Sequence, residues 1–300
     1  MRGPQRVTGM LRRRTRLGDT GRSALATVLA DPTFELLPLK NAADQQAALP
    51  PGARVSVTAS PAKGLEATVA LSVRLEGAGF RVVPHISARM VRDEHHLRAL
   101  FAPLADAGID RAFVVGGDAE EPGAFPDGLS LLEAMTDLGI APTEIGIPCY
   151  PQGHAFIPDD KLLAALHAKA RFASYMTTQL CFDAKAIGSW LAARRADGIE
   201  LPVRIGIPGV AAIPKLIEIS ARIGVRDASR FVLKNTRFVG QLLASGGVYR
   251  PSGLLERLSP LIADPAADVI GLHIYTFNQV AATEDWRRDY LHDRSMGTVT

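Results

Sequence analysis

Residues 81–115 read RVVPHISARMVRDEHHLRALFAPLADAGIDRAFVV, and this stretch decides the fold. Its two ends, Arg81–Ile86 and Arg111–Val115, are short runs rich in β-branched residues, which favour strands. Between them, apolar residues recur at helical spacing over Asp93–Ala107, behind an aspartate that suits a helix N-cap. A strand, a helix and a second strand in this order predict a parallel βαβ unit.

The same alternation continues along the rest of the chain. Eight apolar runs are present: Phe34–Pro38, Arg54–Thr58, Arg81–Ile86, Arg111–Val115, Ile145–Cys149, Tyr175–Cys181, Val203–Ile207 and Val269–Tyr275. Further helical patterns cover Asp159–Ala170, Ala184–Ala196 and Pro214–Ile223. The interval after the first run is short and predicts a degenerate helix, while the long interval before the last run predicts extra helices. Eight strands without a domain-sized linker predict an α/β protein with a single (β/α)8 TIM barrel.

Composition and charge narrow the class of protein. The chain has 47% apolar and 22% charged residues, which is typical of a globular protein with a large core. No apolar run reaches the roughly 18 residues of a membrane-spanning helix, so we expect no membrane partner. The net charge is +3, but residues 1–22 hold seven arginines and one aspartate, so this segment carries +6 and the rest −3. We expect a basic N-terminal extension over residues 1–30, a barrel over residues 31–300 and no nucleic-acid partner, because the basic segment lacks interleaved aromatic residues.

The number of cysteines and the composition of the N-terminal segment indicate the cellular compartment of the protein. Cys149 and Cys181 are the only cysteines, and neither belongs to a CxxC pair. We expect both to be reduced and buried, which argues against a disulfide scaffold or a zinc knuckle. The Arg-rich start lacks the continuous apolar segment of a secretory signal, so we expect a cytoplasmic protein.

Polar residues follow several of the apolar runs, at the strand ends where a barrel of this kind builds its active site. They are Thr58, His85, Asp118, Tyr150, Gln179, His273, Tyr275 and Asn278. Glu35 differs because it lies inside the first run, where an ionised carboxylate without a partner is costly. A carboxyl group in such a place suits general acid catalysis. The alternative is an edge residue that faces solvent or pairs with an arginine.

Asp118 follows Gly116 and Gly117, and a glycine turn lets the backbone approach a ligand closely while it presents one carboxylate. The alternative is an aspartate that only caps a turn. Metal binding by His85 or His154 is disfavoured, because neither the HExxH motif nor Cys/His spacing is present. We therefore expect no metal site.

Seven short motifs follow one another along the chain. They are Phe34-Glu35-Leu36-Leu37-Pro38, Val55-Ser56-Val57-Thr58, Pro84-His85, Gly117-Asp118, Tyr150-Pro151-Gln152-Gly153-His154, Thr178-Gln179 with Phe182-Asp183, and Leu272-His273-Ile274-Tyr275-Thr276-Phe277-Asn278. In this order and spacing they resemble the methylenetetrahydrofolate reductase family over about 245 residues. The resemblance implies a TIM barrel that reduces 5,10-methylenetetrahydrofolate to 5-methyltetrahydrofolate. Such an oxidoreductase belongs to one-carbon metabolism, tetrahydrofolate interconversion and methionine biosynthesis.

The resemblance also implies roles for single residues. Glu35 and Asp118 match the family's catalytic residues: an acid that assists ring opening to an iminium cation, and a carboxylate that stabilises this cation. The implied substrate-binding residues are Gln179, Tyr150 and Tyr275. The implied cofactor-binding residues are Thr58, His85, His154 and Tyr150.

The sequence departs from the family at the positions that hold its flavin. Gly116 stands in place of an arginine, and Gln279 replaces the arginine after Asn278. Because these changes remove phosphate contacts, the resemblance implies that FAD is not required and that NADH or NADPH transfers its hydride directly.

Two other functions stay open on the same barrel. One is a folate-dependent methyl-group enzyme that uses the pterin site without hydride transfer. The other is a non-catalytic folate-binding paralogue, which the altered flavin positions favour and the retention of Glu35 and Asp118 disfavours. The sequence leaves the oligomeric state open.

Overall fold

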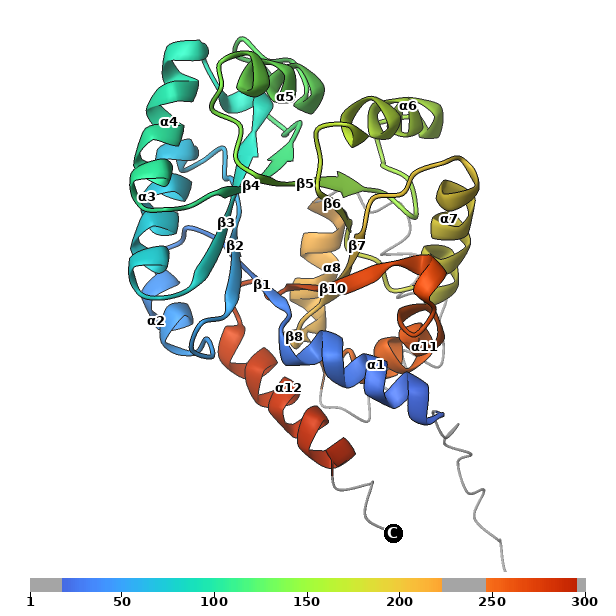
Figure 1. The fold of residues 1–300 in the computed structure, drawn as a ribbon. Coiled ribbons are helices and arrows are strands. Elements are labelled where there is room, and N and C mark those ends of the chain that lie inside the picture. The colour runs from blue at the N-terminus through green and yellow to red at the C-terminus, as the bar shows by residue number, and fades with distance from the viewer. Residues whose placement is uncertain (1–17, 223–246, 296–300) are drawn as a thin grey trace, which may run out of the picture.

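The computed structural model describes residues 18–222 and 247–295. Eight parallel strands close into a barrel in the order β1-β10-β7-β6-β5-β4-β3-β2, and helices surround it (Figure 1). The strands are β1 (Thr33–Leu36), β2 (Arg54–Val57), β3 (Arg81–Ser87), β4 (Arg111–Val115), β5 (Glu144–Cys149), β6 (Tyr175–Thr178), β7 (Val203–Pro208) and β10 (Val269–Tyr275). The predicted α/β class and (β/α)8 TIM barrel are confirmed.

The helices follow their strands along the chain. They are α1 (Asp19–Ala30), α2 (Ala42–Ala47), α3 (Gly64–Gly77), α4 (Glu94–Asp106), α5 (Gly128–Asp137), α6 (Asp159–Ala170), α7 (Ala184–Ala196), α8 (Ile213–Arg222), α11 (Ser252–Ile262) and α12 (Val280–Ser295), with 3-10 turns η1 (Ala88–Met90) and η2 (Pro265–Ala267). The short α2 occupies the interval for which the sequence predicts a degenerate helix. The long interval between β7 and β10 holds α8, α11 and a small antiparallel sheet of β8 (Ala211–Ala212) and β9 (Val248–Tyr249).

Helix α4 shows how the sequence produces the outer layer. The side chain of Asp93 caps the helix by accepting a hydrogen bond from the backbone N–H of His96 at 2.7 Å. The predicted apolar stripe is buried: Leu97, Leu100, Phe101 and Leu104. The helix ends before Gly108, whose φ of +74° lies in the left-handed region that glycine adopts without strain.

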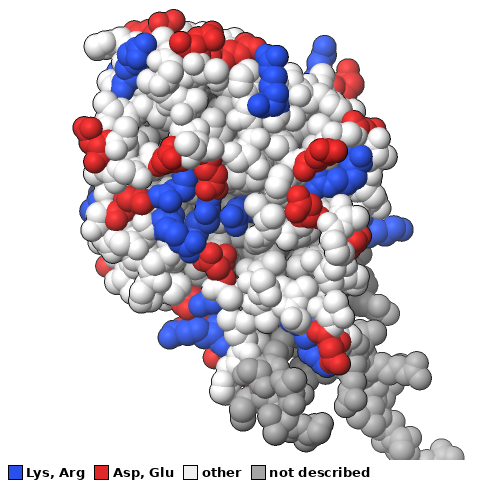
Figure 2. Space-filling view, viewed as in Figure 1, with Lys and Arg blue, Asp and Glu red and all other residues white. Residues whose placement is uncertain are grey.

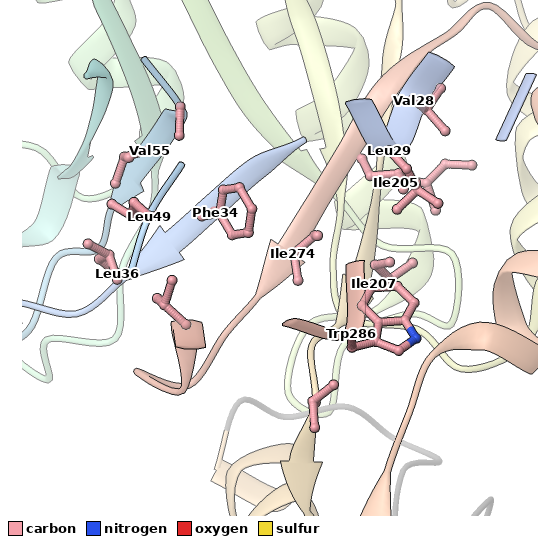
Figure 3. Close-up of a cluster of buried hydrophobic side chains, with 14 of the residues drawn as sticks. Val28, Leu29, Phe34, Leu36, Leu49, Val55, Ile205, Ile207, Ile274 and Trp286 are labelled. Carbon is pink, nitrogen blue, oxygen red and sulfur yellow. The ribbon is translucent and has the colours of Figure 1, made fainter. Parts of the chain in front are cut away.

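The main core lies between the barrel and the helices. Successive side chains of a strand point to opposite faces, so every second residue faces outward. Phe34, Leu36 and Val55 face outward and pack with Leu29 of α1 and Trp286 of α12 (Figure 3). Burying a side chain of this size stabilises the fold by about 1.5–3 kcal/mol, so this layer holds the helices on the barrel.

The barrel interior is filled by a smaller apolar group. Val83, Phe113 and Tyr175 pack there as one buried cluster. A Cβ atom on Gly146 would lie 2.4 Å from Tyr175 Cζ and 2.6 Å from Phe113 Cδ2, so glycine at this position makes room for the two rings. This cluster separates the amino end of the barrel from the carboxyl end.

Helix α1 belongs to the packed body of the protein. Its buried residues Leu25, Val28 and Leu29 join the main core. Residues 1–17, which hold most of the predicted basic extension, lie outside the described residues. The division into an extension over residues 1–30 and a barrel over residues 31–300 stays a prediction. Within the described ranges, every helix falls short of the length and hydropathy that a membrane crossing needs.

The view in Figure 1 fixes the orientation used below. The strands follow one another clockwise around the barrel in this view. Because βαβ crossovers are right-handed, the amino ends of the strands face the reader. Their carboxyl ends, whose loops form the active site in barrels of this kind, lie on the far side.

Candidate active site

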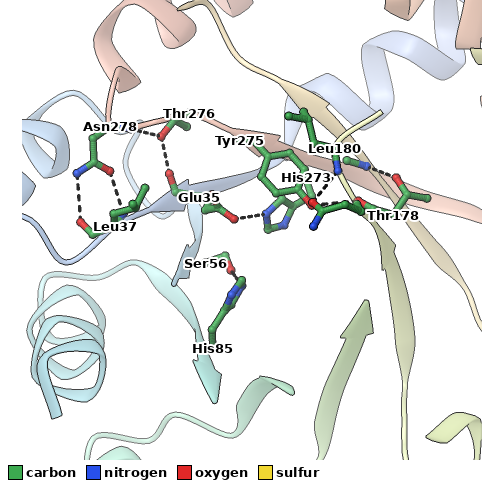
Figure 4. Close-up of polar contacts among 12 residues, drawn as sticks. Glu35, Leu37, Ser56, His85, Thr178, Leu180, His273, Tyr275, Thr276 and Asn278 are labelled. Atoms are coloured by element: carbon green, nitrogen blue, oxygen red, sulfur yellow. Dashed lines mark hydrogen bonds and ion pairs between the residues drawn. The ribbon is translucent and has the colours of Figure 1, made fainter. Parts of the chain in front are cut away.

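Glu35 and His273 meet inside the barrel. They come from the adjacent strands β1 and β10, and both side chains are buried. His273 Nε2 lies 3.3 Å from Glu35 Oε2 (Figure 4). Since the surrounding protein excludes most water, the imidazole is the polar partner that makes a buried carboxylate acceptable here. Glu35 is therefore not a solvent-facing edge residue, and among the described residues its ion-pair partner is His273, not an arginine.

A second polar pair lies beside the first. Ser56 Oγ is 2.6 Å from His85 Nε2, and both groups are buried. The His85 ring packs on Phe113 at a centroid distance of 4.7 Å, and it lies 6.4 Å from the ring of His273. Burial, and then the charge of His273, lower the pKa of His85 to about 3. His85 is thus a neutral imidazole at physiological pH.

Tyr275 adds a phenol next to the two histidines. Its ring lies 4.8 Å from that of His273, and its hydroxyl donates to the backbone carbonyl of Thr178 at 3.1 Å. Burial, and then the nearby Glu35, raise the pKa of Tyr275 well above its usual value. The hydroxyl therefore stays protonated. A Cβ on Gly206 would lie 2.7 Å from Tyr275 Cε2, so glycine leaves space for this ring.

The end of β10 holds β1 in place. Thr276 Oγ1 donates to the backbone carbonyl of Glu35. Asn278 Oδ1 accepts from the N–H of Leu37 at 2.9 Å, and Asn278 Nδ2 donates to the carbonyl of Leu37 at 3.2 Å (Figure 4). Asn278 adopts a φ of +52°, which asparagine tolerates better than most residues. These bonds fix the backbone that carries Glu35.

Three hydroxyl groups near the strand ends have unused hydrogen-bonding capacity. The side-chain oxygens of Thr58, Ser87 and Thr177 are buried and have no hydrogen-bond partner within the part of the chain that the structure describes. Gly117 has a φ of +89°, and a Cβ there would lie 1.8 Å from Ser87 Oγ, so its backbone passes directly over this hydroxyl. Buried polar groups of this kind usually bond to something, and substrate oxygens are suitable partners.

The other predicted site residues lie in the loops after β4 and β5, and Tyr150 is still close enough to act electrostatically on Tyr275. Asp118 is exposed in the loop after β4. Tyr150 follows β5, and its ring meets that of His154 edge-on at 5.5 Å. Burial, and then Cys149 and Asp118, raise the pKa of Tyr150 to about 12. Asp118 is thus grouped with Tyr150, and Glu35 with His273.

Gln179 is turned toward its own backbone. Its Oε1 accepts a hydrogen bond from the N–H of Leu180 at 2.8 Å. Thr58, His85, Tyr275 and Glu35 lie at the barrel interior or its strand ends, as expected. The substrate, cofactor and catalytic roles predicted for all these residues stay predictions, because position alone does not test a role.

Metal-ligating and thiol groups of the described residues take no evident part in this site. Within residues 18–222 and 247–295, no group of three or more His, Cys, Asp or Glu side chains is arranged to hold a metal ion. Cys149 and Cys181 are buried and unpaired. Burial raises the pKa of Cys181 to about 12, so its thiol is not an activated nucleophile.

Two residues of this site were not singled out from the sequence. His273 was noted only as one of several polar residues, and Ser56 only as part of a motif. The signal that identifies both is the alternation of each strand, because Ser56, His85 and His273 share the inward face with Glu35. Sequence alternation shows the face, but it does not show which inward residues meet.

Comparisons with known proteins were made against family models and solved structures. No family model matches the chain. One similar solved structure is described as "a putative lyase/mutase from Burkholderia cenocepacia J2315", with 14% identity and a TM-score of 0.44 over 92% of this chain and 86% of that chain. Another is described as "a putative phosphonomutase from Burkholderia cenocepacia J2315", with 15% identity and a TM-score of 0.40 over 76% of this chain and 99% of that chain. At these values the likeness gives no substrate or reaction to this chain.

These findings correct the predicted family and function. The expected resemblance to methylenetetrahydrofolate reductases is wrong, since no family model matches and the similar structures carry lyase, mutase and phosphonomutase descriptions. The predicted NAD(P)H oxidoreductase that reduces methylenetetrahydrofolate is wrong with it, as are the folate-based alternatives. The physical reason is that each motif is only two to seven residues long, and such strand-end residues arise from barrel geometry in unrelated enzymes.

Proposed function

We propose that this barrel is an acid–base enzyme of the lyase or isomerase type, which moves a proton at a carbon atom of a small, oxygen-rich substrate. The observation that carries the proposal is the buried Glu35–His273 pair, with its distance of 3.3 Å between Nε2 and Oε2. A carboxylate bonded to an imidazole orients the ring and stabilises its charged form, which makes the imidazole an effective base.

The neighbouring groups suit the same chemistry. Removing a proton next to a carbonyl group creates negative charge on oxygen, and fixed donors stabilise this charge. Tyr275 keeps its hydroxyl proton because burial raises its pKa, and it donates this proton to the carbonyl of Thr178, so it fixes the wall of the site and does not bind substrate oxygens. The hydroxyls of Ser87 and Thr177 have no other partner in the described part of the chain. In this proposal His273 takes the proton, Glu35 stabilises the resulting imidazolium, and these two hydroxyl groups bind substrate oxygens.

Neutral His85 has a different place in the proposal. Because its pKa is lowered to about 3, it cannot supply a positive charge near pH 7. It lies next to His273 as an uncharged ring bonded to Ser56. The role of His85 is to exclude water from the space beside His273 while it offers a polar, uncharged ring. Because it stays neutral, it does not compete with His273 for the substrate proton.

The proposed function includes a location in the cell but no cofactor. NADH or NADPH as a cofactor stays a prediction that neither the structure nor the comparisons test, and the acid–base chemistry does not depend on it. We also propose a cytoplasmic protein, which the two unpaired cysteines support.

Proton exchange in heavy water tests the proposal directly. The purified protein is incubated in D2O with a panel of 2-oxo acids and hydroxy acids, and loss of carbon-bound protons is followed by NMR. We expect exchange with at least one compound, and we expect Glu35→Gln and His273→Gln each to slow it by about 10²–10⁴-fold. The matched control is Glu200→Gln, which changes an exposed carboxylate in the loop before β7.

Two outcomes contradict the proposal. One is that wild-type protein exchanges no proton in any compound of the panel. The other is that both variants at Glu35 and His273 exchange as fast as the Glu200→Gln control. Circular dichroism on each variant distinguishes lost catalysis from lost folding.

A further inference from the structure

Four arginines stand at the amino ends of the barrel strands, opposite the acid–base site. Arg54, Arg81 and Arg111 are the first residues of β2, β3 and β4, and Arg204 is the second residue of β7. Figure 2 shows this face, and basic side chains gather near its middle with acidic side chains around them. The amino end of the barrel is therefore closed by charged groups rather than by apolar ones.

Carboxylates balance three of the four charges. Arg81 pairs with Asp31, Arg111 with Glu76 at 2.7 Å, and Arg54 with Glu144. Arg204 forms no ion pair within the residues that the structure describes. In these ion pairs three carboxylates face four guanidinium groups, an excess of one positive charge among these residues, and Asp31 and Glu144 attract Arg204 only from a longer distance.

The excess charge lies where water is scarce. Arg54 is only 8% exposed. The Nε atoms of Arg54 and Arg204 are both buried and have no hydrogen-bond partner among the described residues. Burial, and then the charge of Arg54, lower the pKa of Arg204, so the two guanidinium groups are close enough to repel each other. Arg54 is buried and paired with Glu144, whereas Arg204 is partly exposed and has no ion pair among the described residues, so a bound oxyanion would supply the opposite charge that Arg204 lacks.

The chain also makes space for the guanidinium of Arg204. A Cβ on Gly271 would lie 2.7 Å from Arg204 Nη1, so a larger residue at this position of β10 would displace the guanidinium from its present place. The register of β10 against β7 shifts between Val269 and Gly271, which brings Gly271 opposite Arg204. On its other side, Arg204 Cζ lies 5.3 Å from the ring centroid of Tyr175. Arg204 thus lies between Gly271 and Tyr175, and no carboxylate of the described residues forms an ion pair with it.

We propose that Arg54 and Arg204 form an oxyanion-binding site at the amino end of the barrel, which takes a phosphate or carboxylate group. Arginine presents several N–H donors in a planar fork that matches the oxygens of such groups. Neutralising the excess charge would remove the repulsion between the two arginines. This site is separate from the acid–base site, and it does not depend on the function proposed for that site.

A purely structural role makes the opposite prediction. Residues at this end of a barrel commonly serve stability. If Arg204 only closed the barrel, anions would act on the protein through general screening, and all arginine variants would respond alike. If Arg204 binds an oxyanion, the response is saturable and depends on this side chain.

Thermal unfolding and calorimetry distinguish a purely structural role of Arg204 from oxyanion binding. Wild-type protein, Arg204→Met and the control Arg98→Met, an exposed arginine on α4, are titrated with phosphate, acetate or chloride at constant ionic strength. We expect phosphate or acetate to raise the thermal unfolding midpoint of the wild-type protein until the effect saturates. Whichever anion acts at the lower concentration identifies the ligand group as phosphate or carboxylate. We expect Arg204→Met to weaken binding at least about tenfold and Arg98→Met to leave it unchanged. Without an oxyanion, Arg204→Met should unfold at the same or a higher temperature, since it removes an unpaired charge.

A second variant acts in the other direction. Glu144→Gln removes a carboxylate that competes for Arg54 and should tighten oxyanion binding several-fold. The proposal is overturned if wild-type protein gives no saturable response, if chloride reproduces it, or if Arg204→Met responds like wild type. If Arg204→Met does not fold, the Glu144→Gln variant decides. The proposal is then overturned if this variant binds the oxyanion no more tightly than wild type does.

Discussion

Replacing Gly206 with alanine adds a methyl group at the junction of three strands that support the candidate site. The new Cβ would lie 2.1 Å from the backbone oxygen of Thr178 and 2.7 Å from Tyr275 Cε2. The first of these neighbours is backbone and cannot rotate away. Because the same oxygen accepts the hydroxyl of Tyr275 at 3.1 Å, moving it also disturbs that hydrogen bond.

The expected cost follows from three contributions. Overpacking costs about 1–3 kcal/mol, and the disturbed hydrogen bond costs about 1 kcal/mol. Replacing glycine with alanine also lowers the conformational entropy of the unfolded chain, which stabilises the folded protein by about 0.5 kcal/mol. We therefore expect Gly206→Ala to lower the free energy of unfolding by about 1.5–3.5 kcal/mol.

Urea unfolding followed by tryptophan fluorescence measures this difference, since Trp190 and Trp286 report on the helical layer. The matched control is Gly188→Ala in α7, where a Cβ would meet only Leu261 Cδ1 at 3.9 Å. This control should gain up to about 1 kcal/mol from helix propensity. The reasoning is refuted if Gly206→Ala is as stable as wild type or more stable.

Two further predictions concern stability. His85 has a folded-state pKa lowered from 6.5 to about 3, so the unfolded chain binds a proton between these values and the folded state does not. The contribution of His85 to the free energy of unfolding should therefore be complete above about pH 6.5 and fall by about 1.4 kcal/mol for each pH unit below it. Between these pKa values, the free energy of unfolding of His85→Gln should fall less steeply with decreasing pH than that of wild type. Asp127 caps α5 by accepting from the N–H groups of Leu129 and Ser130, each at 2.9 Å. Asp127→Ala should lower the free energy of unfolding by about 1 kcal/mol, while Asp127→Asn should lose much less, and equal stability of all three proteins would argue against the cap.

Much of the fold follows from short-range patterns. The strands β4 and β10 and the helices α6 and α7 have the bounds that the sequence predicts, because alternating and helical periodicities extend over whole elements. The strand β6 is shorter than its apolar run, since Gln179 to Cys181 leave the barrel to form a loop. Element ends depend on the neighbours that complete the hydrogen bonds, and the local pattern does not contain them.

The candidate site was predicted less completely. Glu35 was recognised because a carboxylate inside an apolar run is unusual. Its partner His273 lies 238 positions away in the sequence, and only closure of the barrel between β1 and β10 brings them together. Asp118 lies in the loop after β4, where its charge acts on Tyr150, and its predicted catalytic role together with Glu35 stays a prediction. Loop conformations are set by contacts across the mouth, so residue type did not reveal this grouping.

The sequence by itself determined the alternation of strands and helices and the barrel class, because each depends on periodicities of a few residues. It left open whether Glu35 faces the barrel interior or solvent. The tertiary structure alone decided which inward groups meet: Glu35 with His273 and Ser56 with His85, while Arg204 forms no ion pair with any carboxylate of the described residues. These pairings depend on the register between strands that are far apart in the chain. The register is set by packing of the whole barrel, since a shift of one residue would move every inward side chain to the other face.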